Sequence, residues 1–512
     1  MNTLLASIPL VIILVLMVIF RWSGAKAGAA GWVAALLIAA LRFGAGPRVL
    51  LWAQIEGLFR ALYVLYIIWG ALLFFRVTEA DGTLAAMSEM LQRLAPDRTL
   101  QVLLLAYGFA SFLQGVGGYG VPVAVVAPIL VSMGLPAPSA VIITSLGHSW
   151  SISFGSLGAS YEALVSATGL EGALIAPWMA AILGFVCLVV GVIVLGMAAG
   201  KGNVGRELGP LLSMGLTMSA VQYVAVRIGL VNIAAMLGAL GGLIVGGIWA
   251  LQRRRRAQQG QGEQVTGGFA LIRTLPYVVL IAIIMAVNFV PALSALLNTW
   301  KIAFDIPARS LANGTILPAG KTQAISVFGH PGAQLVYAAG IALLLATTRG
   351  SLPPGSGVKI RAGVLKSGTQ STLGILTMMA MAITMQASGM VSELAAAMAA
   401  LAGRLFPLVA PFIGALGAFM TGSNTNANVL MGALQLQVAE KLGLFVPLAL
   451  ALHNAGAAVG SVFAPAKIMV GCSTVGLSGS ESDVLRRTTQ YSLIVIAITG
   501  ALGLVLAGLI AN

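Results

Sequence analysis

Long apolar runs, separated by short polar or basic stretches, follow one another along almost the whole chain. They recur from Leu4–Phe20 to Ser492–Ile510, and each is close to the roughly 20 residues that a helix needs to cross a bilayer. By this length rule we expect an all-α polytopic membrane protein with about 12 to 14 transmembrane or half-membrane helices. Within this pattern, Thr83–Leu94 is predicted to be an amphipathic connector and Thr372–Ala400 a single span.

Two of the apolar runs are interrupted in their middle by glycine and small polar residues. The segment Gly422–Asn428 reads Gly-Ser-Asn-Thr-Asn-Ala-Asn, and Gly115–Gly120 reads Gly-Val-Gly-Gly-Tyr-Gly, 307 positions earlier. Such a sequence favours a broken helix, because free backbone groups at membrane depth are tolerated only where protein or a water-filled cavity satisfies them. Paired interruptions in the two halves of a chain are the sequence feature that best locates the substrate site of a transporter.

The paired interruptions divide the chain into two membrane halves. We expect a first half over residues 1–252 with its broken hairpin at 100–133, and a second half over 269–512 with its broken hairpin at 405–439. Residues 253–268, which begin with four arginines and continue with glutamine and glycine, are predicted to be a cytoplasmic linker, since basic residues mark cytoplasmic loops.

The amino-acid composition supports a membrane protein and argues against a nucleic-acid partner. Hydrophobic residues make up 59% of the chain and charged residues 8%, whereas a soluble domain carries about 25% charged residues. The net charge of +14 does not indicate a nucleic-acid partner, because the basic residues lie at the ends of spans, where the positive-inside rule places them. We expect contact with membrane lipid, no nucleic acid, no cofactor and no metal.

Cys187 and Cys472 are interpreted as packed free thiols. The polar insertion Trp300–Phe328 is interpreted as a surface loop or a partly re-entrant segment.

The two interruptions carry groups that suit a small carboxylate. The glycines let backbone N–H groups converge, and a half-helix starting at Val121 would direct its positive end toward them. Hydroxyl and amide groups of the second interruption can both donate and accept hydrogen bonds. Their oxygens would equally suit Na⁺, so this chemistry leaves anion and cation open. The predicted substrate-binding residues are Gln114, Gly117, Gly118, Tyr119, Gly120, Ser423, Asn424, Thr425, Asn426 and Asn454.

Lys467, which follows an Ala-Pro pair, has two interpretations. Its ammonium could pair with a substrate carboxylate, or its side chain could extend to the membrane surface. A channel and an enzyme are disfavoured: two unlike half-sites share one long chain, and no nucleophile–base pair or metal-ligand spacing is visible. We therefore expect a secondary transporter and not an enzyme.

Three segments resemble the signatures of a known family. Phe112–Ala124 is similar to the first-hairpin pattern of the bacterial L-lactate permeases, and Phe419–Leu430 with Ala464–Gly476 is similar to their second-half signature. The resemblance spans most of the chain. It implies proton-coupled symport of L-lactate and related 2-hydroxymonocarboxylates, such as glycolate, across a bacterial inner membrane. It also implies the two-hairpin architecture of the wider ion-transporter superfamily and elevator-type movement.

The chain departs from the family pattern at Gln114, where that pattern carries a glutamate. The proton is then predicted to travel on His148, His453 or Glu162. Each histidine follows one interruption at a similar distance, and histidine has the unperturbed pKa, about 6.5, closest to working pH. A sodium-coupled carrier of another small organic anion is the alternative, and a homodimer is left open.

Overall fold

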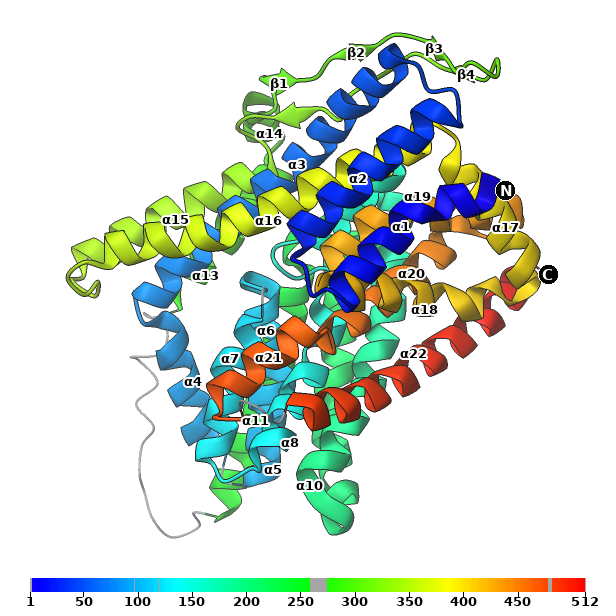
Figure 1. Ribbon diagram of the computed structural model, residues 1–512. Helices are drawn as coiled ribbons and strands as arrows, with labels where there is room; N and C mark the ends of the chain where they lie inside the picture. The colour runs from blue at the N-terminus through cyan, green and yellow to red at the C-terminus, as the bar shows by residue number, and fades with distance from the viewer. Residues whose placement is uncertain (1, 96, 119, 258–273, 478–480, 512) are drawn as a thin grey trace.

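The protein is built almost entirely of helices. The computed structural model describes residues 2–511, apart from 96, 119, 258–273 and 478–480 (Figure 1). Over these residues nine helices, or up to eleven if each bent pair is one span, are long and apolar enough to cross a membrane. Asn2–Val18 and Val121–Ser132 are shorter apolar helices. The predicted all-α polytopic membrane fold is confirmed.

The first half of the chain begins with two helices of ordinary length and a long third one. The predicted connector Thr83–Leu94 is a helix with the expected bounds. Its elements are α1 (Asn2–Val18), α2 (Gly24–Leu41), α3 (Pro47–Ala80), α4 (Thr83–Leu94), α5 (Arg98–Val102), the π-helix η1 (Leu103–Phe109), α6 (Ala110–Val116), α7 (Val121–Ser132), α8 (Ala137–Gly147), the 3-10 turn η2 (Ser149–Ser151), α9 (Ala159–Thr168), α10 (Gly172–Arg227), the 3-10 turn η3 (Val231–Ile233) and α11 (Ala234–Ala257).

The second half repeats the succession of long and broken helices. Its helical elements are α13 (Leu275–Phe289), α14 (Pro291–Leu297), α15 (Pro331–Thr348), α16 (Ser356–Ala387), α17 (Met390–Ala402), the 3-10 turn η4 (Gly403–Leu405), α18 (Phe406–Thr421), α19 (Asn424–Lys441), α20 (Val446–Val462), α21 (Pro465–Thr474) and α22 (Glu481–Ala511).

The element α10 folds back on itself, so that it supplies two spans. The Ser219 hydroxyl donates to the Gly184 carbonyl at 3.0 Å, and the Gln222 amide reaches the Ala180 carbonyl at 3.5 Å. Because the residue numbers rise on one arm as they fall on the other, the two arms run antiparallel. Gly184 permits this approach, since a Cβ there would lie 3.0 Å from the Ser219 side chain.

Both predicted interruptions are breaks between helices. The chain leaves α6 at Gly117 and re-enters a helix at Val121, and it leaves α18 at Gly422 and re-enters α19 at Asn424. Gly422 has a φ of +68°, a left-handed conformation that glycine adopts without strain. Two further breaks follow in corresponding places, between α8 and α9 and between α20 and α21, the latter with a bend of 40°.

The expected single span Thr372–Ala400 is wrong. Its residues are divided between α16, which ends at Ala387, and α17, which begins at Met390. Gly389 separates the two helices with a φ of +85°, a conformation that ends a right-handed helix. The hydropathy of the run is continuous across this glycine, so composition alone does not reveal the turn.

The polar insertion is a ribbon of short antiparallel strands on the surface. The strand β1 (Lys301–Ile302) pairs with β6 (Ile325–Ser326), β2 (Asp305–Ile306) with β5 (Gly320–Lys321), and β3 (Arg309–Ser310) with β4 (Ile316–Leu317). The ribbon lies at the upper end of α3 in Figure 1, and Phe304 packs edge-on against Phe59 of that helix at 5.2 Å. The interpretation as a surface segment is confirmed.

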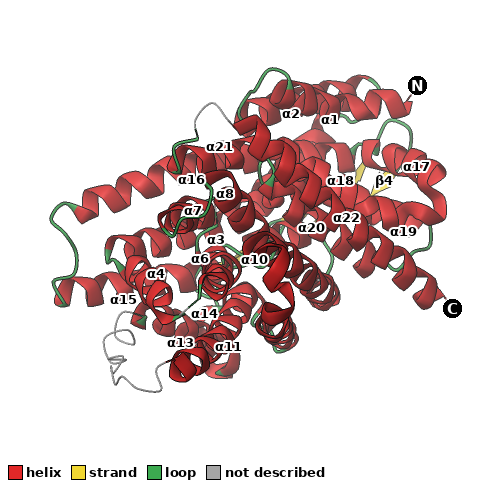
Figure 2. Cartoon of the chain, turned by 90° about the horizontal axis from the view of Figure 1, so that it is seen from below, coloured by secondary structure: helices red, strands yellow, loops and turns green. Residues whose placement is uncertain are grey.

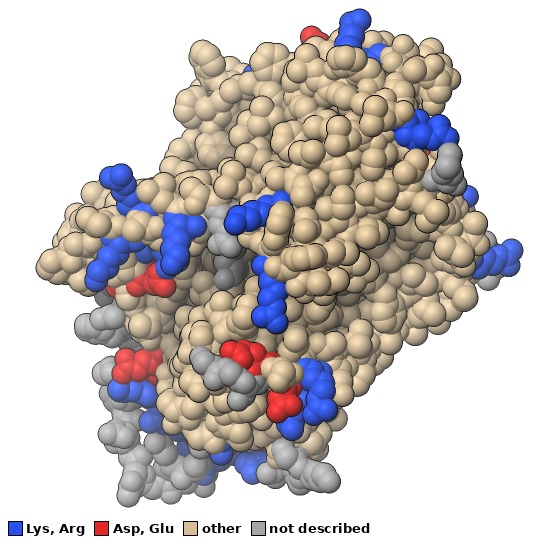
Figure 3. Space-filling model, in the orientation of Figure 1, with Lys and Arg blue, Asp and Glu red and all other residues tan. Residues whose placement is uncertain are grey.

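Elements from the two halves of the sequence pack against each other. Helix α3 lies along α15 and α16, α9 along α19, and α10 along α20. Viewed from below, α18, α20 and α22 lie together on one side of the molecule, while α13 and α15 lie on the other (Figure 2). Figure 3 shows charged side chains in separate groups with large uncharged areas between them, as a lipid-facing surface requires.

An ion cluster fixes the end of α11 at which the basic residues gather. The Arg253 guanidinium donates to Glu207 at 2.8 Å and to Asp97 at 2.9 Å. Glu207 is 3% exposed, so this arginine neutralises a buried carboxylate.

Candidate functional site

A cavity of about 310 Å³ lies where the two interruptions meet, and we call it the hairpin cavity. It therefore joins segments that lie 307 residues apart in the sequence, as the repeat predicts. By volume it has room for about ten water molecules, which suits a small organic molecule and some accompanying water. Its lining residues are Gly24, Ala25, Ile68, Gln114, Gly120, Ile152, Ser156, Ser160, Ser367, Ser371, Gly374, Ile375, Thr421, Gly422, Ser423, Asn424, Thr425, Asn426, Ala466, Lys467 and Val470.

Hydrogen bonds tie the second interruption to the start of α9. The hydroxyl groups of Ser160 and Thr425 are 2.8 Å apart, and the Asn428 amide donates to the Ser160 carbonyl at 2.7 Å. The Asn424 amide donates to the Ser153 hydroxyl at 3.2 Å. The N-termini of α9 and α19 are thereby held side by side at the cavity, although they come from different halves of the chain.

The free carbonyl groups at the end of α6 are satisfied by the segment that precedes α9. The Ser156 N–H donates to the Gln114 carbonyl at 2.8 Å, and the Leu157 N–H to the Gly115 carbonyl at 3.0 Å. Ser156 and Leu157 have φ values of +48° and +55°, which are unfavourable for residues with a Cβ. Such strain is typical of functional sites, where surrounding contacts hold the backbone in place. Here it places the Ser156 side chain on the cavity wall.

The hairpin cavity is electrostatically biased toward an anion. The N-terminal ends of four helices contribute to its wall: α7 through Gly120, α9 through Ser160, α19 through Ser423 and α21 through Ala466. Each end carries a partial positive charge, because its first N–H groups have no partner within the helix. The Ser423 hydroxyl accepts from the Asn426 N–H at 3.3 Å. The N–H groups of Asn424 and Thr425 in the same turn have no partner among the described residues and are available to a ligand.

Lys467 adds a full positive charge to this wall. It is the one charged side chain among the lining residues, none of which is acidic. Its ammonium donates to the Ser461 hydroxyl at 3.1 Å, and within the described residues it forms no ion pair. Since a half-buried ammonium is stabilised by an opposite charge, a carboxylate ligand would complete its surroundings.

Most of the predicted substrate-binding residues line the hairpin cavity: Gln114, Gly120, Ser423, Asn424, Thr425 and Asn426. Gly117 and Gly118 lie behind the wall, where an added Cβ would meet the Phe75 ring and the Ser156 hydroxyl. Asn454 is fully buried in α20 and does not line the cavity. Tyr119 lies outside the described residues. Gln114 and Asn424 are 3% and 2% exposed, and each has an amide oxygen without a hydrogen-bond partner in the part of the chain that the structure describes.

None of the three candidate proton carriers lines the hairpin cavity. The His148 Nδ1 lies 2.6 Å from the Thr144 carbonyl one turn earlier in α8. His453 is fully buried in α20, and neither ring nitrogen has a hydrogen-bond partner among the described residues. Glu162 is buried in the first turn of α9, on the side away from the cavity.

Several lining residues were not among the predicted ones. Lys467 was left undecided, because sequence does not show whether a lysine near a helix end faces a cavity or the surface. Ser156 belongs to the break between α8 and α9, and Ser160 lies in the first turn of α9. The repeated serines of the segment Ser149–Ser156 were an available signal. The serines of α16, Ser367 and Ser371, carried no such signal, since single serines are common in membrane helices.

Comparison with known proteins assigns the chain to a family. A model of the L-lactate permease family matches residues 2–510. An L-lactate permease of Streptococcus iniae is 28% identical, with 86% of this chain and 92% of that protein covered. An L-lactate permease of Bacillus subtilis is 26% identical, with 97% and 94% covered. The glycolate permease GlcA of Escherichia coli is also 26% identical, with 99% and 96% covered.

Two solved transporter structures are more distantly similar. The YdaH transporter of Alcanivorax borkumensis has a TM-score of 0.44 at 15% identity, with 86% of this chain and 85% of that chain covered. MtrF of Neisseria gonorrhoeae has a TM-score of 0.46 at 15% identity, with 92% and 84% covered. On the family match over nearly its whole length, this chain belongs to the L-lactate permease family, and it is a multi-pass transporter of the bacterial inner membrane and not an enzyme.

Proposed function

We propose that this protein carries L-lactate and related small 2-hydroxymonocarboxylates, such as glycolate, across the inner membrane in symport with a proton. The observation that carries the proposal is the hairpin cavity, which combines one ammonium, four helix N-termini and no acidic lining residue. The names of the relatives, L-lactate permease and glycolate permease, agree with a small hydroxycarboxylate as the ligand.

The proposed binding mode divides the substrate between two kinds of group. The carboxylate is bound by the Lys467 ammonium and by free N–H groups at the start of α19. The 2-hydroxyl both donates and accepts, which matches the amide side chains of Gln114 and Asn426 on the same wall. The carboxylate neutralises Lys467, so the occupied cavity carries no net charge.

Alternating access is proposed to come from relative movement of two groups of helices. One wall of the hairpin cavity comes from α2, α3 and α16, and the other from the broken helices α6–α9, α18–α19 and α21. A cavity between two such groups can open to either side of the membrane when one group slides along the other, as in an elevator.

Uptake of labelled L-lactate into proteoliposomes tests the function. With the purified protein, we expect accumulation above the equilibrium level when the outside is made acidic, and equilibration without accumulation when no gradient is imposed. Accumulation driven by an imposed sodium gradient at equal pH would instead support the sodium-coupled alternative. Absence of lactate and glycolate uptake under every gradient would contradict the proposed substrate class.

Replacing Lys467 by Met tests the binding mode, because Met keeps most of the side-chain volume and removes the charge. Loss of one partner of a buried ion pair costs about 3–5 kcal/mol, so lactate affinity should fall by about 100-fold or more. The matched control is Lys441→Met, at the exposed far end of α19. Lactate protection against thermal unfolding measures the affinity. Equal protection of both variants would exclude Lys467 from the site.

A further inference from the structure

Glu162 lies directly behind the wall of the hairpin cavity. It follows Ser160 by two residues in the first turn of α9 and is 8% exposed. The Asn232 amide of η3 reaches the Glu162 Oε1 at 3.5 Å and donates to the Leu157 carbonyl at 3.2 Å. The carboxylate is therefore turned toward η3, whereas the Ser160 hydroxyl of the same turn meets Thr425 at the cavity.

The neighbours of this carboxylate do not neutralise it. Two tyrosines face it, Tyr63 from α3 and the adjacent Tyr161 of α9. Arg60, one turn before Tyr63, instead donates to the Ser166 carbonyl and pairs with Glu56. Among the described residues no charged side chain of α3, α10, α16 or α19 forms an ion pair with Glu162. Burying an unpaired carboxylate is expensive unless a proton or another cation neutralises it.

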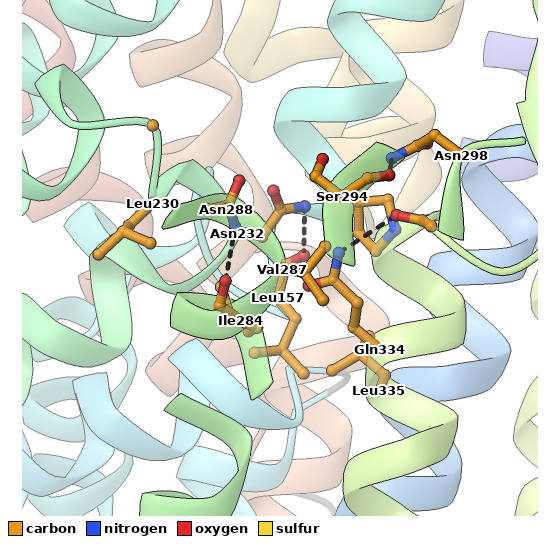
Figure 4. A pocket seen from close by; sticks show the side chains of 13 residues that line it. Leu157, Leu230, Asn232, Ile284, Val287, Asn288, Ser294, Asn298, Gln334 and Leu335 are labelled. Atoms are coloured by element: carbon orange, nitrogen blue, oxygen red, sulfur yellow. Dashed lines mark hydrogen bonds between the residues drawn. The ribbon is translucent and has the colours of Figure 1, made fainter. Parts of the chain in front are cut away.

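A second pocket, of about 150 Å³, begins where Asn232 covers the carboxylate. We call it the amide pocket, because four amide side chains line it: Asn232, Asn288, Asn298 and Gln334. Figure 4 shows these side chains around one space, with Asn232 bonded to Leu157 beside them. None of its lining residues also lines the hairpin cavity. A polar pocket of this size holds water, and a chain of water molecules conducts protons.

The amide pocket lies toward the outer face of the membrane. Its wall includes Gly229 and Leu230, which precede α11, and Asn298 and Gly329, which flank the β-ribbon. The Arg253–Arg256 cluster lies at the opposite end of α11 and marks the cytoplasmic side. A helix of this length spans roughly the thickness of the membrane, so the pocket is on the outer side.

We propose that Glu162 binds the co-transported proton, and that the proton reaches it from the outside through the amide pocket, by a path separate from that of the substrate. This inference rests on the proposed proton symport and assigns its proton site. The proton adds to a carboxylate oxygen and removes one negative charge from the interior. The Ser160 and Thr425 hydroxyls join the turn of α9 that holds Glu162 to the turn of α19 that binds the substrate. Protonation of Glu162 and binding of the substrate therefore act on the same pair of helix ends.

Glu162→Gln tests the assignment, since glutamine resembles the protonated side chain in shape and polarity. We expect accumulation of lactate driven by an acidic outside to fall to the equilibrium level, while exchange of internal for external lactate continues at a rate within about threefold of the unaltered protein. Glu393→Gln, at the first turn of α17, is the matched control and should accumulate normally. Tyr63→Phe is a second variant and should shift the pH dependence of accumulation.

A cysteine in the amide pocket tests the path. In a background with Cys187 and Cys472 replaced by Ser, Asn288→Cys places a thiol on an exposed position of the pocket wall. A charged, membrane-impermeant methanethiosulfonate added outside should abolish proton-driven accumulation and leave exchange unaffected. Thr299→Cys, an exposed position outside the pocket lining, is the control.

The outcomes separate this inference from the function on which it rests. If the unaltered protein shows no lactate accumulation in a proton gradient, the proposed function fails. If the unaltered protein accumulates lactate and Glu162→Gln does so equally, the proton is bound elsewhere and this inference is overturned. Normal accumulation after complete labelling of Asn288→Cys would overturn the path through the amide pocket.

Discussion

Asn424 and Asn426 occupy the first turn of α19, but their surroundings give them different roles. Asn424 is 2% exposed, and its amide is committed to the Ser153 hydroxyl at 3.2 Å. Asn426 is only half-buried, and its side-chain nitrogen lies 4.0 Å from a Cβ built on Gly24 and 3.8 Å from one built on Gly374, both of which line the cavity. The first side chain therefore holds the second interruption to the segment that precedes α9, while the second is available to a ligand.

Leucine at each position separates these roles. Asn426→Leu should lower lactate affinity by about tenfold or more, because one hydrogen bond to a ligand contributes about 1.5 kcal/mol, with little change in the thermal midpoint of the empty protein. Asn424→Leu should lower that midpoint, since it leaves Ser153 unpaired at a cost of about 1–3 kcal/mol. Thermal unfolding with and without lactate measures both effects. Equal destabilisation by the two variants would contradict the distinction.

The residue types of the site were predictable from the sequence, but their neighbours were not. The polar run Ser423–Asn426 was recognisable because its four polar residues interrupt an otherwise apolar span. Whether Lys467 faces the cavity depends on how α21 packs, which no local pattern encodes. His148 and His453 were candidates because each follows a break at a similar distance, yet neither lines the hairpin cavity.

At the scale of elements, hydropathy predicted the ends of helices wherever polar residues follow an apolar run. It located both broken hairpins and α4, because in each case polar residues mark the boundary. It failed at Gly389, where a single glycine turns the chain inside a continuous apolar run. A glycine with positive φ and a glycine that serves helix packing look alike in sequence, since both lack only a Cβ.

Gly115 affects the site through helix packing and does not itself line the hairpin cavity. A Cβ at this position would lie 2.9 Å from the Met236 backbone, so α6 approaches α11 as closely as a glycine allows. Gly115→Ala should push α6 away and disturb the bond from Leu157 to the Gly115 carbonyl. Overpacking of this kind costs about 1–3 kcal/mol, so we expect a lower thermal midpoint and slower lactate uptake.

Gly196→Ala in α10 is the matched control for this substitution. A Cβ there would meet none of the described atoms within 4 Å, and alanine is the better helix former by about 1 kcal/mol. This variant should keep both stability and uptake. A Gly115→Ala protein as stable and active as Gly196→Ala would show that α6 can shift without affecting the site.

At the scale of the whole molecule, the contact between α3 and α9 decides whether the two groups of helices can slide. The Ser166 hydroxyl of α9 donates to the Arg60 carbonyl of α3 at 3.3 Å, and the Arg60 side chain returns a bond to the Ser166 carbonyl. This contact lies close to the turn that holds Glu162. If α9 travels with the substrate, the contact between Arg60 and Ser166 must break in every transport cycle.

A cross-link between these two positions tests the movement. In the background without native cysteines, Arg60→Cys with Ser166→Cys should react with a short bifunctional thiol reagent, because the two residues are in direct contact. We expect uptake and exchange to stop after cross-linking and to return after reduction, whereas lactate still binds. A pair within one helix, Glu89→Cys with Arg93→Cys of α4, is also in direct contact and should leave transport intact. Full transport with both pairs cross-linked would mean that α3 and α9 move together, and the sliding surface would then lie elsewhere around the hairpin cavity.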